Sequence, residues 1–403
     1  MKNHTIDLSV YIIVLCYNSR KWLYKCINSL SKTNYSYFKI LLVDNASTDG
    51  SIEEISTQFP EVLVIKNNRN YGWCQGNNIG IQYALERGAD LVFLSNADME
   101  YHQPEWLAHL IETYKQYPTY PVLGPLQYEY DDEKTLNEWS LYIMESGSRN
   151  VHYMWSDLLN TSKGSYEESA LSSHLLDVYF VQGAAMLIHK SALLSVGLFD
   201  PLYYIFFDEV DFSRRNLRIG NRIALVPSSR VKHFGSGDNS SNRKMQWKRN
   251  YYFVRSKYYF HLSDYQMKSA IRWEVLKKWI KNDIKDALSN KEEISGIGQL
   301  LLIYFQVLIH LPDIIKKRRK ELVMEQKIIT SKVTDCIVKL IPLFTESDMN
   351  KNLNIDFGLD SIGMMELVIM IEEEFNLIFD VDVDMAQLYL PSFIVTYICE
   401  YQR

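Results

Sequence analysis

Carboxylate and amide side chains gather behind the apolar segments in the first half of the chain. Such side chains can hold a divalent cation, hydrogen-bond to hydroxyl groups or accept a proton, so their placement decides which chemistry is open to the protein. The clusters are YNS at 17–19, DNASTD at 44–49, NNRNYG at 67–72 and NAD at 96–98. A further acidic cluster, FFDEVDF, follows at 206–212.

The segments before these clusters predict the elements that must position them. Short apolar runs rich in β-branched residues at 10–17, 39–44, 62–66 and 91–98 alternate with amphipathic helical segments. This pattern is typical of a parallel sheet covered by helices, an open α/β domain of Rossmann type. Ligands of such sheets bind at the carboxyl ends of the strands, so we expect four loops to converge on one site.

Length and cysteine usage favour a modular cytoplasmic protein. The chain has 403 residues, more than the ~250 to 300 residues that a single hydrophobic core usually serves. Its five cysteines show neither a zinc-binding nor a disulfide spacing. The N-terminal apolar run has no basic leader and no cleavage signal, so we expect a reducing, cytoplasmic location.

Charge is distributed unevenly along the chain. Residues 325–403 carry 14 acidic and 5 basic side chains, and the whole chain has a formal net charge of -6. An acidic C-terminal part favours docking on basic partners and argues against nucleic acid as a substrate. The dense basic run KKRRK at 316–320 follows the apolar stretch IGQLLLIYFQVLIHL, an arrangement that suits a membrane surface better than a phosphate groove.

Residues 8 to about 260 resemble a family 2 glycosyltransferase, in particular its rhamnosyltransferase-like branch. Five motifs occur in the family's order: VDNASTDGS, NYGWCQGNNIGI, SNAD, QGAAMLIHKSALLSVGLFD and FFDEVDFSRR. The resemblance implies a GT-A fold, a nucleotide-diphospho-sugar donor and an inverting transfer. The residues that it assigns to binding the nucleotide sugar are Tyr17, Asn18, Asp44, Asn45, Asp49, Asn70, Gly72, Gly76, Asn78, Asn96 and Ala97. Asp44 and Asp49 remain open to a second interpretation as turn-forming residues.

The NAD sequence stands where the family carries its DxD metal motif. The resemblance implies that Asp98 binds Mg²⁺ or Mn²⁺, that Asn96 is a neutral ligand in place of the first acid, and that His233 completes the shell. Because an amide brings no charge, we expect weaker metal affinity than a full DxD site would give. For His233 the alternative is a histidine that closes a loop by hydrogen bonding.

The acidic cluster at 206–212 resembles the family's catalytic motif, with the order of its two acids exchanged. One carboxylate must deprotonate the acceptor hydroxyl on the side opposite the leaving group. Register places Glu209 at the general-base position, Asp208 stays in contention, and Asp211 is expected to complete the catalytic group by orienting a loop. The alternative is an acid cluster that only caps a helix N-terminus.

Periodicity fades between 127 and 176, where aromatic residues accumulate. They predict either a platform on which an acceptor sugar stacks or the packing of an irregular lobe. The aromatic residues concerned are Tyr128, Tyr130, Trp139, Tyr142, Tyr153 and Trp155.

Residues 325–403 resemble an acyl or peptidyl carrier domain, an all-α four-helix bundle. The segment FGLDSIGMMELVIMIEEEF at 357–375 is similar to the phosphopantetheine attachment region of these carriers, which implies 4'-phosphopantetheine on Ser361. Ser361 opens a helix, whose positive end favours a phosphate; an ordinary N-cap serine is the alternative. Met364, Leu367, Ile371 and Phe375 are spaced to face the bundle core. Ile362, Met365 and Ile369 form a second face, on which a phosphopantetheinyl transferase and an acyl-loading enzyme are expected to dock.

The sequence thus predicts a GT-A glycosyltransferase domain at 1–260, a helical extension at 261–324 and a carrier domain at 325–403. The extension is expected to contact a membrane peripherally through 297–320, at its inner face, with a buried packing helix as the alternative. We expect transfer of a sugar, with a deoxyhexose favoured, from a dTDP or UDP donor to a hydroxyl acceptor linked to acyl-carrier chemistry. The alternative is a carrier and scaffold protein with an inactive transferase half. Whether the arm presents the acceptor or recruits the enzyme stays open.

Overall fold

Strands and amphipathic helices alternate through the first half of the chain, as the sequence predicts. The computed structural model describes residues 7–129, 132–136, 175–234, 243–289, 296–375, 377–380 and 383–401. In chain order the first elements are β1 (Val10–Cys16), α1 (Arg20–Leu30), β2 (Phe38–Asp44), α2 (Ser51–Gln58), β3 (Leu63–Lys66), α3 (Gly72–Glu86), β4 (Leu91–Asn96), β5 (Met99–Glu100) and α4 (Trp106–Gln116). They are followed by β6 (Val122–Glu129), β7 (Asp132–Leu136), β8 (Leu176–Asp177), β9 (Ala185–His189), α6 (Lys190–Val196), α7 (Asp208–Arg218) and β10 (Ile223–His233).

The strands form one mixed sheet in the order β3-β2-β1-β4-β9-β6-β10-β5. β1 pairs in parallel with β2 and β4, and β2 pairs in parallel with β3. β9 is antiparallel to both β4 and β6, so the sheet is not purely parallel. In the register of β1, Cys16 lies beside Asp44 and Leu15 lies beside Asn96, and the predicted polar clusters therefore meet at one edge.

Alternate residues of the central strands feed two hydrophobic cores. Val10 and Ile12 of β1 belong to a core that also holds side chains of α1, α2 and α4. Tyr11 and Ile13 point to the opposite face, into a core built with α3, α6 and α7. The two-residue alternation of a strand explains why β1 is buried on both faces.

Strand β9 occupies only the second half of an apolar segment of the sequence. The apolar segment 178–189 is extended as β9 only from Ala185, because the Ala185 amide donates a hydrogen bond to the Gln182 carbonyl in a turn. The residues before this turn pack as irregular chain, with Val181 against Gly124 of β6.

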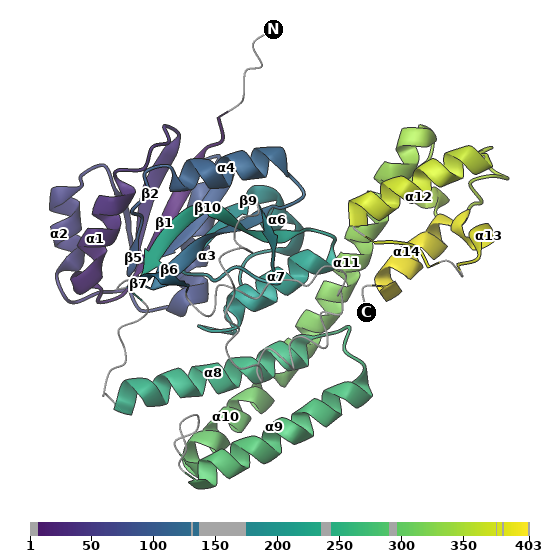
Figure 1. Ribbon diagram of the computed structural model, residues 1–403. Helices are drawn as coiled ribbons and strands as arrows, with labels where there is room; N and C mark the ends of the chain where they lie inside the picture. The colour runs from purple at the N-terminus through teal and green to yellow at the C-terminus, as the bar shows by residue number, and fades with distance from the viewer. Residues whose placement is uncertain are drawn as a thin grey trace.

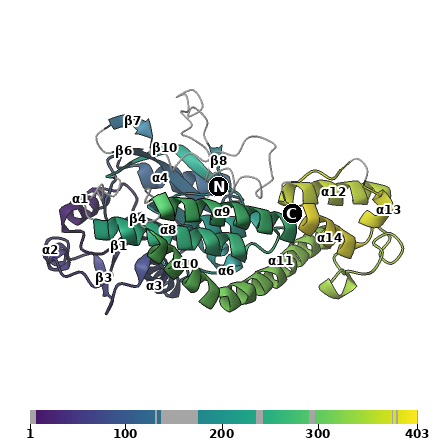
Figure 2. The same ribbon diagram turned by 90° about the horizontal axis from the view of Figure 1, so that it is seen from below.

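Four helices form a layer against the sheet domain: α8 (Arg243–Ser263), α9 (Ser269–Ser289), α10 (Ile297–Ile309) and α11 (Leu311–Leu340). Val254 of α8, Ile303 of α10 and Ile314 of α11 belong to the same core as α3 and α7. Figure 1 shows the layer below the sheet, and Figure 2 shows it from below. The predicted boundaries at 260 and 324 fall inside the continuous helices α8 and α11.

No single helix in the described ranges is long and apolar enough to cross a membrane. Helices α10 and α11 meet such a test of length and composition together, but they are bent by 49° at the break between them. Pro312 stands in the first turn of α11, where the missing amide of a proline leaves no helical hydrogen bond unmade.

The carrier part is a small helical bundle with a core of its own. The end of α11 packs there with the 3-10 helix η3 (Glu346–Asp348), α12 (Ser361–Phe375), α13 (Met385–Leu388) and α14 (Pro391–Tyr401). Figure 1 shows the bundle at the far end of α11. The C-terminal end of α12 approaches the catalytic domain, since a Cβ built on Gly220, just after α7, would lie 3.4 Å from the Glu374 carbonyl and from the Phe375 ring.

Candidate active site

The loops after β1 and β2 form one side of the site. Asn18 has a left-handed backbone, with φ of 50°, and its Oδ1 accepts a hydrogen bond from the Thr48 amide at 2.8 Å. Asp44 is buried, and its Oδ1 accepts a hydrogen bond from the Ser47 amide at 2.8 Å. Tyr17 is exposed beside them. The structure therefore brings these predicted nucleotide-binding residues together at the sheet edge.

Asp49 has a capping role that the sequence prediction did not assign. Its Oδ2 accepts a hydrogen bond from the Arg20 amide at 2.9 Å, at the start of α1. Its Oδ1 accepts hydrogen bonds from the Ser51 amide at 3.1 Å and the Ser51 hydroxyl at 2.6 Å, at the start of α2. Burial opposes ionisation, but these hydrogen bonds lower the pKa of Asp49. Both oxygens satisfy helix N-termini, so we correct the assignment of Asp49 to the nucleotide.

The NNRNYG loop is held by its own Asn70 and by Asn45 of the loop after β2. Asn45 Nδ2 donates to the Gly72 carbonyl at 3.0 Å, and Asn70 Oδ1 accepts a hydrogen bond from the Gly72 amide at 2.8 Å. A Cβ on Gly72 would lie 2.5 Å from the Tyr204 ring, and a Cβ on Gly76 would lie 2.6 Å from Leu15 Cδ1. The two glycines therefore allow close packing of α3 inside the protein, rather than the predicted approach of a nucleotide sugar.

Asn78 also has a structural role. The side chain is buried in α3; its Nδ2 donates to the Phe199 carbonyl at 2.7 Å, and its Oδ1 accepts from the Phe199 amide at 3.1 Å. Both ends of the amide are thus used to hold the chain between α6 and α7. Asn78 was predicted to bind the nucleotide sugar, and this geometry corrects that assignment.

Asp98 and His233 lie together although they are far apart in the sequence. His233 Nε2 is 3.4 Å from Asp98 Oδ1, and the Phe234 amide donates to the Asp98 carbonyl at 3.0 Å. The Asn96 amide points elsewhere, because its Oδ1 accepts a hydrogen bond from Trp73 Nε1 at 3.1 Å. Ala97 is buried in the core beside α1, so its side chain is not available to a ligand. The described residues contain no cluster of three or more histidine, cysteine or acidic side chains that could hold a metal ion.

Asp208 and Glu209 form a coupled acid pair at the N-terminus of α7. Asp208 is buried and Glu209 is partly buried. Burial, and then the negative charge of Asp208, raise the pKa of Glu209 well above its usual range. Burial also raises the pKa of Asp208, while its hydrogen bonds to Glu209 and to the Cys74 thiol lower it. The direction of these shifts favours a pair that holds one proton between two carboxylates.

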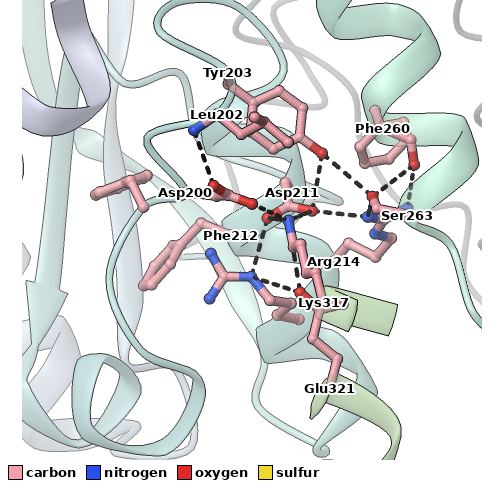
Figure 3. A network of polar contacts seen from close by, with 12 residues as sticks. Asp200, Leu202, Tyr203, Asp211, Phe212, Arg214, Phe260, Ser263, Lys317 and Glu321 are labelled. Carbon is pink, nitrogen blue, oxygen red and sulfur yellow. Dashed lines mark hydrogen bonds and ion pairs between the residues drawn. The ribbon is translucent and has the colours of Figure 1, made fainter. Parts of the chain in front are cut away.

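Asp211 is a structural ion-pair centre. It is fully buried, and its oxygens lie 2.7 Å from Arg214, 3.0 Å from Arg215 and 3.0 Å from Lys317. Figure 3 shows Arg214 and Lys317 beside this carboxylate. Burial opposes its charge, but Lys317, Arg215 and Arg214 hold the pKa of Asp211 well below its usual range. The three cations occupy both oxygens of Asp211, so its contacts fit the predicted loop-orienting role rather than a direct part in proton transfer.

Three residues of this site carried no signal in the sequence. The carbonyl of Tyr204 accepts hydrogen bonds from the amides of Trp73, at 2.7 Å, and Cys74, at 3.3 Å, which join the loop before α7 to the start of α3. Burial, and then the charge of Asp208, raise the pKa of Cys74 well above its usual value, so its thiol is a neutral donor. The hydrogen-bonding partner of each of these three residues lies more than 120 residues away in the sequence, so no local pattern could have identified their contacts.

The predicted aromatic platform lies mostly outside the described residues. The aromatic residues that fall outside the described residues are Tyr130, Trp139, Tyr142, Tyr153 and Trp155. Tyr128 is described: it is buried on β6 in the core.

Ser361 stands exposed at the first position of α12. The capping role belongs to Asp360, whose Oδ1 accepts a hydrogen bond from the Gly363 amide at 2.8 Å. Met364, Leu367, Ile371 and Phe375 are buried in the bundle core, as the sequence predicts. Ile362, Met365 and Ile369 are exposed by 76%, 62% and 52%, which confirms the predicted second apolar face.

Two family models match separate parts of the chain. Residues 11–193 match glycosyl transferase family 2, and residues 331–389 match the phosphopantetheine attachment site. N-acetylglucosaminyl-diphospho-decaprenol L-rhamnosyltransferase of Mycobacterium tuberculosis is 24% identical over 232 residues, which are 55% of this chain and 75% of that protein. Rhamnosyltransferase WbbL of Escherichia coli is 23% identical over 286 residues, which are 70% of this chain and 98% of that protein.

Solved glycosyltransferase structures also align with this chain. A structure of GalNAc-T7 with UDP, GalNAc and Mn²⁺ has a TM-score of 0.47 and 19% identity, and the alignment covers 72% of this chain and 59% of that one. Residues 1–349 of S. aureus TarS have a TM-score of 0.47 and 14% identity, with 81% and 85% of the two chains covered.

The strand-end loops lie within the first matched region and the exposed serine of α12 lies within the second, while the acid pair of α7 follows the first matched region in the chain. The chain carries a region that matches glycosyl transferase family 2 at residues 11–193, followed by a phosphopantetheine attachment domain at 331–389.

Proposed function

We propose that the catalytic domain transfers a sugar from a nucleoside-diphosphate donor to a hydroxyl acceptor with inversion at the sugar carbon. The observation that carries this proposal is the acid pair Asp208 and Glu209. It stands at the start of α7, next to the loop that Trp73 and Cys74 join to the nucleotide side of the sheet. A base whose pKa is raised toward the working pH is well suited to take a proton during reaction.

Glu209 is the proposed general base. It accepts the proton of the acceptor hydroxyl while the acceptor oxygen forms a bond to the anomeric carbon. The bond between that carbon and the diphosphate oxygen breaks, and the electron pair leaves with the nucleoside diphosphate. Asp208 keeps Glu209 in position and raises the proton affinity of Glu209 through its own negative charge.

The names of the relatives support a deoxyhexose donor. The M. tuberculosis and E. coli proteins are rhamnosyltransferases, and a dTDP-rhamnosyl transferase of Shigella flexneri is 23% identical over 237 residues. We therefore favour dTDP-rhamnose as the first donor to test, with UDP-sugars as the second group.

Asp98 and His233 fit a divalent cation that is shared with the donor. Mg²⁺ and Mn²⁺ are commonly held by one or two protein groups together with substrate phosphates, rather than by a complete cage of side chains. A carboxylate oxygen and an imidazole nitrogen 3.4 Å apart are suitable for such a shared site. When bound, the cation would stabilise the negative charge that develops on the leaving diphosphate.

Removing Asp98 should abolish the metal dependence of nucleotide binding. We expect Asp98→Ala to bind dTDP equally well with and without Mn²⁺ in calorimetric titrations, whereas the wild type binds it more tightly with Mn²⁺. His233→Ala should show a smaller loss in the same direction. Asn96→Ala is the comparison variant and should matter least, because Asn96 Oδ1 already accepts a hydrogen bond from Trp73.

If the wild type binds nucleotides equally well in excess chelator, the proposed cation site is wrong. If it turns over no nucleotide sugar with Mn²⁺ present, the second candidate function gains support: a carrier and scaffold protein without transfer activity. The Asn96 amide, turned to Trp73 where relatives have a charged acid, favours that candidate.

Glu209→Gln should lower the transfer rate by about 10² to 10⁴-fold, the usual contribution of a general base, while nucleotide affinity is retained. Asp208→Asn should retain more transfer activity but change its pH dependence. The pKa of Glu209 is raised by burial and then by Asp208; removal of this negative charge lowers that pKa, so the acid limb of the rate profile should move to lower pH. Initial rates from pH 5 to 9 would measure the shift.

If Asp208→Asn loses more of the transfer rate than Glu209→Gln does, Asp208 is the base. An acid limb that stays in place in Asp208→Asn would contradict the coupling between the two carboxylates. Glu53→Gln is a suitable control, because Glu53 is an exposed glutamate of α2 paired with Lys66 and should leave both rate and profile unchanged.

We propose that Ser361 carries 4'-phosphopantetheine and that the arm presents a hydroxylated acyl acceptor. The serine is exposed while Asp360 caps the helix, so a transferase has access to its hydroxyl. Tethering gives the acceptor a high effective concentration. However, Ser361 lies at the N-terminal end of α12, whereas the Gly220 contact lies at its C-terminal end. The two ends are about 21 Å apart at 1.5 Å per residue. This arrangement favours delivery to the site of a second chain, or movement of the bundle before delivery.

Co-expression with a broad-specificity phosphopantetheinyl transferase should give a mass adduct on the wild type and none on Ser361→Ala. Ser392→Ala is a suitable control, because Ser392 is a second serine in the first turn of a carrier helix, α14, and should leave the adduct in place. An unmodified wild type would contradict the assignment.

Mixing two variants separates delivery within a chain from delivery between chains. Glu209→Gln protein with a hydroxyacyl arm is combined with Ser361→Ala protein and donor. Sugar that appears on the Glu209→Gln arm has come from the other chain's site. If sugar appears on the arm of hydroxyacyl-loaded wild type but not on the Glu209→Gln arm in the mixture, delivery takes place within one chain.

We propose that α9 and α10 dock on an anionic membrane surface at the inner face of the membrane. Leu301, Phe305 and Leu308 of α10 are exposed, and so are Trp273 and Leu288 of α9. The exposed lysines of α9 are Lys277, Lys278, Lys281 and Lys285. Apolar side chains beside several lysines are complementary to a lipid surface with anionic head groups.

Part of the predicted basic run serves another purpose. Lys317, the second residue of KKRRK, is mostly buried and paired with Asp200 and Asp211. The membrane proposal therefore rests on α9 and α10 together with the exposed Lys316, Arg319 and Lys320, and not on the whole run.

Flotation with liposomes that contain 30% anionic lipid should carry the wild type to the top of a gradient at low salt and less of it at high salt, because salt screens the lysines. Leu308→Glu should bind less, since a charge enters the apolar face. Leu194→Glu is the matched control, because Leu194 of α6 is even more exposed but lies outside α9 and α10. Wild-type protein that stays at the bottom would contradict the proposal.

A further inference from the structure

The loop that delivers the acid pair has an unfavourable backbone. Tyr204, Phe206 and Phe207, just before Asp208, have φ values of 65°, 68° and 64°. Such left-handed conformations are unfavourable for residues with side chains, and they persist only where the surrounding structure fixes them. The position of the acid pair therefore depends on what holds this loop.

Helix α8 holds the carbonyl groups of the loop. Arg255 donates to the carbonyls of Leu202, at 3.2 Å, and Tyr203, at 2.7 Å. Ser256 Oγ donates within 3.2 Å to the carbonyls of Tyr203 and Ile205. Arg255 is therefore used inside the protein.

Lys317 of α11 joins the two ends of the same loop. Its Nζ is 2.8 Å from Asp200 Oδ2, before the loop, and 3.0 Å from Asp211 Oδ2, in the first turn of α7. Asp200 in turn accepts a hydrogen bond from the Leu202 amide at 2.9 Å. Figure 3 shows Lys317 between the two carboxylates.

The two carboxylates depend on Lys317 to different degrees. Asp211 keeps Arg214 and Arg215 as partners when Lys317 is removed. For Asp200, Lys317 is the one cationic partner among the described ion pairs. Loss of the Lys317 charge would therefore free the entrance of the loop while the buried centre of α7 stays paired.

We propose that Lys317 is a positioning residue for the transfer reaction: it closes the strained loop across Asp200 and Asp211 and thereby fixes Glu209 for proton removal. This inference rests on the proposed transfer function. Lys317 does not touch the acid pair; it acts through the loop. Its helix continues into the carrier core, where Ile329 and Val333 are buried, so the same helix bears the positioning residue and supports the carrier domain.

Lys317→Met tests the proposal in the full-length chain, since methionine keeps the length of the side chain and removes its charge. We expect the maximal transfer rate to fall about 10- to 100-fold, the scale of a small misplacement of a catalytic group, while the KM for the donor stays within about twofold. Lys317→Arg, which keeps the charge, should recover most of the rate. Lys327→Met is the matched control, because Lys327 is an exposed lysine of the same helix, and it should behave as wild type.

Amide hydrogen exchange gives a readout that does not need activity. We expect faster exchange in peptides covering 200–211 of Lys317→Met, and unchanged exchange in β1 and β4. A Lys317→Met enzyme with the wild-type rate and wild-type exchange would overturn the proposal, as would a rate loss that Lys317→Arg does not recover. A wild type without transfer would instead refute the proposed function, and the exchange experiment would still test Lys317.

Asp200→Asn covers the case in which Lys317→Met fails to fold. This variant weakens only the entrance of the loop and leaves the cations of the buried centre paired with Asp211. It should show the same loss of rate with little change in donor KM, and the same faster exchange at 200–211. Wild-type rate and exchange in Asp200→Asn would overturn the proposal.

Discussion

The buried carboxylate of Asp211 is the interaction on which the arrangement of the catalytic domain depends. A charge in a protein interior is tolerated only when partners compensate for its lost hydration, and Asp211 has three cationic partners. Two come from its own helix, α7, and the third comes from α11, more than 100 residues later. Removing this carboxylate would leave three cations without a common partner, so α7 and α11 are bound to each other electrostatically as well as by their shared core.

This constraint changes the meaning of the helical layer. The helical layer, which spans the end of the predicted catalytic domain and the predicted helical extension, supplies Arg255 and Ser256, which hold the loop before α7, and Lys317, which pairs with Asp211. It also adds Val254, Ile303 and Ile314 to the core beneath α3 and α7. The sheet domain alone therefore does not account for the shape of the site, because the loop is held from outside the sheet.

The sequence was sufficient for features that depend on local pattern. Burial of β1 on both faces, the ends of the first strands and the apolar stripe of α12 follow from the pattern of apolar residues, and each is present in the structure. Asp98 and His233 could be paired only through a family resemblance, since nothing local connects residues so far apart. The partners of Gly76, Asn78 and Asp211 could not be identified beforehand, because polar residues and glycines beside a site look alike in sequence. Their roles are set by distant partners, namely Leu15, Phe199 and Lys317.

Helix α11 runs without interruption from the catalytic core to the carrier core, over 30 residues. An α-helix turns by about 100° and advances by 1.5 Å per residue, so the direction in which the carrier faces is fixed by the number of residues between Lys317 and Ile329. Loss or gain of one residue there would turn the bundle by more than a quarter of a circle and detach α12 from Gly220. A change in the length of this segment therefore keeps the carrier facing the same way only when it is close to a whole number of turns, such as seven residues. A flexible interdomain linker would impose no such periodicity.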